Sequence, residues 1–95
     1  MIKTFRHKGL ERYWSSGDGR LLPPAQLRKI RRILDAIDVL EHVPKDLEPF
    51  RNWRPHPLKP PLEGFWSLDV TGNYRIIFRF ENGDAYDLDY LDTHG

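Results

Sequence analysis

The chain has 95 residues, which is enough for one domain with a single modest core. It contains no cysteine, which excludes a disulfide framework and a thiolate metal site. Its net charge of +1 is well short of the basic excess that would by itself indicate nucleic-acid binding. No segment has the apolar run of a signal peptide or a membrane span, so we expect one cytoplasmic domain over residues 1–95.

The N-terminal part of the chain contains two short predicted elements. Met1–Phe5 has a β-type composition and is predicted to join a sheet formed later in the chain. Lys8–Ser15 is predicted to be a helix because three large side chains recur at helical spacing, namely Leu10, Tyr13 and Trp14. Two glycines and polar residues in Ser15–Gly19 end it.

The strongest predicted element is a helix over Ala25–His42, which follows two prolines and ends before Pro44. Its apolar residues follow the spacing of one buried stripe: Leu27, Ile30, Ile33, Leu34, Ile37 and Leu40. Its outer side carries Arg28, Lys29, Arg31 and Arg32. Such a side either follows RNA phosphates or is simply solvated, with Asp35 as an ion-pair partner for Arg31.

A proline-rich segment connects this helix to the rest of the chain. Lys45–Phe50 is predicted to be a connector with about one helical turn. Pro55 and Pro57 then lie two residues apart, so in an extended chain their missing N–H groups face the same edge. We therefore expect an edge strand or a polyproline-like segment that holds His56 between two fixed φ angles.

The last third of the chain, Gly64–Gly95, contains three strand-like runs separated by glycine and asparagine turns, which predicts an antiparallel meander. A two-residue loop at Asn82-Gly83 would mix the faces, so three-residue loops are predicted at Thr71–Asn73 and Glu81–Gly83. This register pairs Leu68 with Ile76, Trp66 with Phe78, Phe78 with Tyr86, and Ile76 with Leu88. One face is then apolar and the other polar, with Arg75 between Asp69 and Asp89.

Motifs for metals and cofactors are absent from the sequence. The four histidines have no metal-ligand spacing, and there is no Walker loop, GxGxxG or GxSxG. We therefore expect no cofactor. The groups that remain for chemistry are His56, Lys59, Arg75, Asp92 and His94.

Two imidazoles and two fixed cations suit metal-free cleavage of RNA. One group accepts the 2′-hydroxyl proton, another protonates the departing 5′-oxygen, and the cations stabilise the phosphorane. Each residue also has a structural interpretation: His56 as a strand end, Lys59 as a loop residue, Arg75 as an ion-pair partner and His94 as part of a frayed terminus.

Several short motifs give the chain a resemblance to a known family over nearly its whole length. They are the opening MIKTFRHKGL, His56-Pro57-Leu58-Lys59, Gly64-Phe65-Trp66-Ser67, Asn73-Tyr74-Arg75-Ile76, Asn82-Gly83-Asp84-Ala85-Tyr86 and Asp92-Thr93-His94. In order and spacing they resemble the HigB toxins of the RelE/ParE superfamily of type II toxin–antitoxin systems.

The resemblance implies a compact α+β domain with two N-terminal helices packed on a twisted antiparallel sheet. It implies a ribosome-dependent mRNA endoribonuclease that inhibits translation. It also implies a helix-turn-helix antitoxin of the HigA type, which represses the operon, so that the toxin meets operator DNA only through its antitoxin. By this resemblance Arg75 and Lys59 hold the scissile phosphate, while His56, Asp92 and His94 serve proton transfer and orientation. RNA-binding candidates beside them are Arg28, Arg31, Arg32 and Arg79.

The chain departs from the family pattern at two points. Thr93 replaces a tyrosine that usually stands between the aspartate and the histidine, and Thr71 and Gly72 stand where some relatives have a further arginine. Two other functions therefore stay open. One is gyrase inhibition of the ParE type, which needs no histidine pair, and the other is an antitoxin-binding module whose nuclease activity has decayed.

Overall fold

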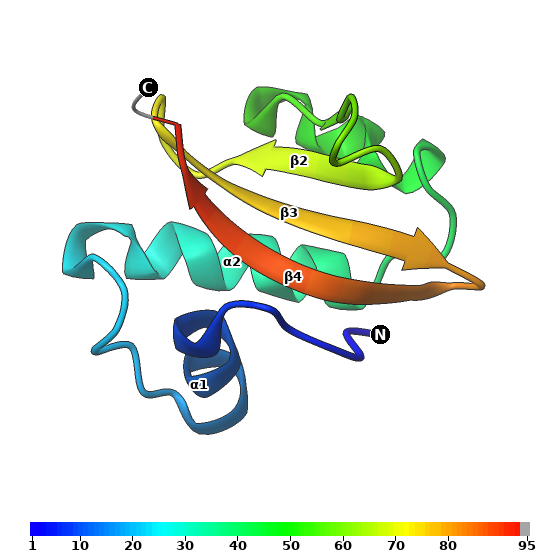
Figure 1. Ribbon diagram of the computed structural model, residues 1–95. Helices are drawn as coiled ribbons and strands as arrows, with labels where there is room; N and C mark the ends of the chain where they lie inside the picture. The colour runs from blue at the N-terminus through cyan, green and yellow to red at the C-terminus, as the bar shows by residue number, and fades with distance from the viewer. Residues whose placement is uncertain (94–95) are drawn as a thin grey trace.

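The computed structural model describes residues 1–93 as helices packed on one face of a four-stranded antiparallel sheet (Figure 1). The strands lie in the order β1-β2-β3-β4, which is also their order in the sequence. In chain order the elements are α1 (Lys8–Ser16), the 3-10 helix η1 (Pro24–Gln26), α2 (Leu27–Asp38), the 3-10 segment η2 (Lys45–Trp53), β1 (His56–Pro57), β2 (Phe65–Asp69), β3 (Tyr74–Glu81) and β4 (Asp84–Asp92). The predicted α+β class and the meander are confirmed.

The first helix matches its predicted range to within one residue. The backbone N–H of Leu10 donates to Nδ1 of His7 over 3.2 Å, which caps the first turn of α1. Gly17 ends the helix with a left-handed backbone, φ 77°, and its N–H donates to the carbonyl of Tyr13.

The second helix is shorter than predicted at both ends. The prolines open a 3-10 turn, η1, before the α-helix begins at Leu27, and α2 ends at Asp38, well before Pro44. The Asp38 carboxylate accepts a hydrogen bond from the N–H of Ile2, which ties the helix end to the start of the chain. Leu40 is buried although it follows the helix, so the apolar stripe continued beyond the helical backbone.

Met1–Phe5 joins the sheet as predicted, beside β4. It makes two isolated parallel bridges, Ile2 with Ala85 and Phe5 with Leu88, instead of a continuous strand. At the opposite edge, His56 and Pro57 form the two-residue strand β1, which confirms the edge position expected from the prolines.

The predicted register of β2 and β3 is confirmed, with Trp66 opposite Phe78 and Leu68 opposite Ile76. The predicted loop between β3 and β4 is wrong. The turn has two residues, Asn82 and Gly83, with φ of 50° and 84°, which fits the left-handed turn that Asn-Gly favours.

A β-bulge in β4 keeps one face of the sheet apolar and the other polar although the turn is short. Asp87 has φ 56°, and the pairing of β3 with β4 shifts by one residue at this point. Tyr86 therefore lies opposite Arg79 on the polar face, contrary to the prediction that paired it with Phe78. After the bulge, Leu88 is buried in the core beneath the helices.

The bulge residue Asp87 is held by polar contacts. Its carboxylate accepts from Nε of Arg79 over 2.9 Å, and this hydrogen bond lowers the pKa of Asp87. A lowered carboxylate pKa gives stability that is present above the unfolded value and lost as pH falls through the folded value. We expect Asp87→Asn to lower the melting temperature at about pH 7, and the difference from the wild-type chain to shrink as pH falls below about 4, the ordinary range of an aspartate pKa.

Thermal melts of both chains across that pH range measure the effect. Asp35→Asn is the matched control, because Asp35 makes an exposed ion pair within one helix. A difference between Asp87→Asn and wild type that stays constant with pH would contradict the expectation.

Candidate functional site

The sheet face turned away from the helices carries the candidate chemistry. The register places His56 opposite Ser67, Ser67 opposite Ile77, and Ile77 opposite Asp89, in one row across the sheet. In the next row Arg75 lies between Asp69 and Leu91. Directly opposed residues share a face, so His56 and Arg75 lie on the same side, with Cα atoms about 12 Å apart from strand geometry.

The imidazole of His56 is half-buried at the sheet edge, and its orientation is fixed by the backbone. Nδ1 lies 2.7 Å from the carbonyl oxygen of Arg54. A carbonyl only accepts hydrogen bonds, so Nδ1 carries the proton in this contact. The flanking residues Pro55 and Pro57 restrict the backbone on both sides of the ring.

Arg75 is half-buried, and one nitrogen of its guanidinium is buried without a partner. Its Nε has no hydrogen-bond partner, and within residues 1–93 it makes no ion pair. The predicted position between Asp69 and Asp89 is correct only for Asp69, because the bulge sets Asp89 opposite Ile77. Asp69 instead lies 3.7 Å from Nε of Arg54, so Arg75 has positive charge available for an anion.

The other sequence candidates lie at three places. Lys59 is exposed in the loop after β1. Asp92 is the last residue of β4 and lies opposite Tyr74, at the same end of the sheet as Arg75. Because Asp92 follows Tyr90 by two residues, it belongs to the same face as Tyr90, which is the face opposite to that of Arg75. His94 lies outside the described residues. The described structure thus brings His56 and Arg75 to one face and leaves Asp92 at the rim.

Tyr90 lies two residues before Asp92 in β4, on the face of the sheet that the helices cover. Its hydroxyl donates to Oε1 of Gln26, and its ring stacks on Tyr74 at 5.2 Å between centroids. Burial raises the pKa of Tyr90 to about 12, with smaller contributions from Tyr74 and Asp92. Tyr90 therefore stays neutral and acts as a packing residue beneath Asp92.

Thr93, where the resemblance places a tyrosine, is tied to the turn between β2 and β3. Its hydroxyl donates to the carbonyl of Asn73 over 2.8 Å, and its N–H donates to the same oxygen over 2.6 Å. The end of β4 is thereby fixed beside Arg75, which follows Asn73 by two residues.

The RNA-binding candidates divide between two sides of the molecule. Arg28, Arg31 and Arg32 are exposed on α2, which covers the apolar face of the sheet, so they lie on the far side from His56. Arg31 pairs with Asp35 as predicted, at 3.2 Å, and lies over the ring of Trp14. On the polar face Arg79 pairs with Asp87 and Glu81, and this partnership raises the pKa of its guanidinium.

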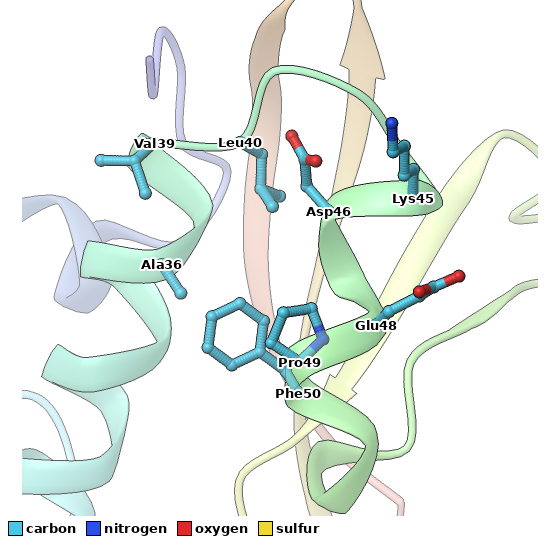
Figure 2. Close-up of a pocket in the computed structure, with 8 residues that line it drawn as sticks. All are labelled: Ala36, Val39, Leu40, Lys45, Asp46, Glu48, Pro49 and Phe50. Atoms are coloured by element: carbon cyan, nitrogen blue, oxygen red, sulfur yellow. The ribbon is translucent and has the colours of Figure 1, made fainter.

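A groove lies away from these residues, between the end of α2 and η2 (Figure 2). It has a volume of about 340 Å³ and is lined by Ala36, Val39, Leu40, Lys45, Asp46, Glu48, Pro49 and Phe50. Asp46 is already engaged, because it accepts from the N–H groups of Glu41 and His42. None of the sequence candidates within residues 1–93 lines this groove.

Neither a metal site nor a membrane-spanning helix is found in the described part of the chain. Within residues 1–93 no three His, Asp or Glu side chains are grouped so that they could hold a metal ion. In the same residues no helix has the length and apolar character needed to cross a membrane.

Arg54 is a residue of the polar face that the sequence did not indicate. It precedes a proline, and such residues favour an extended backbone, so nothing in the sequence indicated its left-handed conformation with φ 52°. The one signal in the sequence was the Pro55-His56-Pro57 pattern. A histidine held between two prolines can have its tautomer set by a hydrogen bond from one ring nitrogen to a nearby backbone group. Ser67, opposite His56, was missed too, and its buried hydroxyl has no partner among the described residues.

Comparison with known sequences gives one family and two relatives. The sequence profile of a family described as "RelE-like toxin of type II toxin-antitoxin system HigB" matches residues 3–94. "Endoribonuclease HigB" from Proteus vulgaris is 40% identical over 94 residues, which are 99% of this chain and 100% of the relative. An uncharacterized protein from Haemophilus influenzae is 33% identical over 91 residues, 95% of this chain and 88% of its own length.

Solved structures share the fold at low sequence identity. The YoeB-YefM complex from Staphylococcus aureus gives a TM-score of 0.54 at 21% identity and covers 96% of this chain and 95% of its own. The toxin–antitoxin complex RelBE2 from Mycobacterium tuberculosis gives 0.52 at 18% identity and covers 96% of both chains. These likenesses show the fold alone.

Proposed function

Since the chain belongs to the RelE-like HigB toxins of type II toxin–antitoxin systems, we propose that it is an endoribonuclease that cleaves mRNA on the ribosome and so inhibits translation. The observation that carries this proposal is that His56 and Arg75 lie on the same face of the sheet. The ring of His56 has a fixed orientation, and Arg75 makes no ion pair within residues 1–93. Proton transfer and anion binding are the two needs of metal-free RNA cleavage.

In the proposed reaction the 2′-hydroxyl oxygen attacks the adjacent phosphorus and loses its proton to a base. The bond from phosphorus to the 5′-oxygen breaks, and an acid protonates that oxygen. The products are a 2′,3′-cyclic phosphate and a free 5′-hydroxyl. Arg75 and Lys59 bind the phosphate oxygens, while His56, Asp92 and His94 share proton transfer and orientation.

An antitoxin is the expected protein partner, because the family is described as toxins of type II toxin–antitoxin systems and one structural neighbour is a toxin–antitoxin complex. We propose that it is a helix-turn-helix protein of the HigA type, through which alone the toxin meets operator DNA. The ribosome and mRNA are the other proposed partners, and they place the activity in the cytoplasm.

The experiment adds the purified protein to a defined translation reaction and maps mRNA ends by primer extension. We expect cuts within the decoded codon that are absent without ribosomes and absent with His94→Ala. Intact mRNA throughout would reject the nuclease and leave gyrase inhibition or an antitoxin-binding module. Gyrase supercoiling assays separate those two.

The basic side of α2 is proposed to contribute to ribosome binding and not to chemistry. We expect the double reversal Arg28→Glu with Arg31→Glu to weaken ribosome binding about tenfold at low salt, with a smaller loss at high salt. The cleavage rate at saturating ribosomes should stay unchanged, because these residues lie on the far side of the sheet from His56.

Ribosome sedimentation at two salt concentrations measures the binding, and Arg20→Glu is the control. Arg20 is an exposed arginine outside α2, paired with Asp18. Unchanged sedimentation of the double variant would remove α2 from the RNA interface.

A further inference from the structure

We propose that Arg54 is a positioning residue of the site, whose left-handed backbone directs its carbonyl oxygen to Nδ1 of His56 and reserves Nε2 for proton exchange with RNA. This inference deepens the proposed function and rests on it for its catalytic meaning. It concerns a main-chain group, so it does not depend on the chemistry of the arginine side chain.

The backbone of Arg54 has an unusual conformation. Its φ of 52° and ψ of 55° lie in the left-handed region, which residues with a Cβ seldom adopt. The conformation is also unusual for a residue that precedes proline, since Pro55 favours an extended backbone before it. Strained backbone of this kind clusters at functional sites, where surrounding contacts hold it.

Arg54 is held at three points. Its N–H donates to the carbonyl of Arg51 over 2.9 Å, which ends η2. Its side chain is 77% exposed, with Nε 3.7 Å from Oδ2 of Asp69, whose own side chain is only 13% exposed. Its carbonyl accepts from His56. The left-handed residue thus connects η2, β2 and the imidazole.

The contact with Arg54 decides which ring nitrogen of His56 carries the proton. A neutral imidazole carries one N–H, and the hydrogen bond made by one nitrogen decides which nitrogen keeps it. Because the Arg54 carbonyl can only accept, Nδ1 keeps the proton and Nε2 has the lone pair. Whether His56 serves as base or as acid, the transferred proton therefore passes through Nε2.

The test compares two substitutions that both remove the guanidinium. Arg54→Asn tolerates the left-handed backbone, whereas Arg54→Val strongly disfavours it because valine is β-branched. The ring nitrogens of His56 are observed by long-range ¹H–¹⁵N NMR of the free protein at alkaline pH. Wild type and Arg54→Asn should have the proton on Nδ1, and Arg54→Val should show a large fraction with the proton on Nε2.

The same variants are assayed for mRNA cleavage at saturating ribosomes. We expect Arg54→Asn to cleave within about twofold of wild type and Arg54→Val about tenfold more slowly, part of the hundred- to ten-thousand-fold that a positioned acid or base supplies. Amide spectra verify that each variant is folded, and Arg54→Ala replaces Arg54→Val if the latter is unfolded.

Two outcomes would overturn the inference. One is a wild-type His56 with its neutral proton on Nε2, and the other is the same ring signals in Arg54→Val as in wild type. The NMR result stands without ribosomes, so a wild-type chain that leaves mRNA intact would reject the proposed function while the tautomer measurement still decides the role of Arg54.

Discussion

Replacing His56 by alanine is expected to lower the rate of mRNA cleavage about a hundred- to ten-thousand-fold, the usual contribution of a positioned acid or base. The imidazole is the one described candidate with a titratable nitrogen and a fixed orientation, and Arg75 lies on the same face for the phosphate. The rate should be measured in a single turnover at saturating ribosomes, so that substrate binding does not limit it.

His42→Ala is the matched control for His56→Ala. The His42 side chain is exposed, and its described hydrogen bonds are made by the backbone: its N–H donates to the Asp46 carboxylate, and its carbonyl accepts from the N–H of Asp46. It should cleave at the wild-type rate. A His56→Ala rate within about twofold of wild type would remove His56 from the proton transfer.

Truncating Phe78 to alanine is expected to lower the free energy of unfolding by about 3–5 kcal/mol. The ring has 0% exposure and is among the largest fully buried side chains of the core, between the sheet and the helices. A domain of this size has a total stability of about 5–15 kcal/mol, so the variant loses a large share of it. Urea titration followed by tryptophan fluorescence measures the change.

Phe80→Ala is the matched control on the same strand, two residues further along β3. Its ring is only half-buried, so we expect a smaller cost of about 1–2 kcal/mol. Equal costs for the two truncations would mean that Phe78 does not have the central packing position described.

The sequence predicted the parts of the fold that follow from apolar spacing. The stripe from Ile30 to Leu40 indicated the covering helix, and the alternation in Tyr74–Phe80 indicated the face of β3 that it covers. The register of β2 with β3 followed from matching the apolar residues of both strands. These patterns were sufficient because each strand alternates without interruption there.

Two left-handed residues account for what was not predicted in the sheet and beside His56. Asp87 is neither glycine nor asparagine, so nothing in the sequence indicated a bulge, and a longer loop was needed to keep the faces apart. Arg54 is unexpected for the same reason, and it lies before a proline. In both cases tertiary contacts hold the backbone, Thr4 and Arg79 around Asp87 and Asp69 beside Arg54.

The sequence predicted candidate residues and only part of their arrangement. The alternation around Arg75 predicted its face of β3, and the flanking prolines predicted an edge position for His56, but the face that the two residues share follows only from the register of β1 with β2. The partner of His56 could not be predicted, because it is a carbonyl group, which every residue has.

The bulge at Asp87 also means that β4 has one residue more than its partner strand β3 at this point. With Asp87 removed, Leu88 would lie directly opposite Phe78, and Ala85, Leu88 and Tyr90 would keep their faces in an uninterrupted ladder. Loss of that one residue therefore keeps the core-facing side chains on their face, whereas loss of one residue elsewhere in β4 would move the side chains beyond it to the opposite face. Gaps inside this strand are thus acceptable when relatives of different length are aligned, and they need not be moved into a loop.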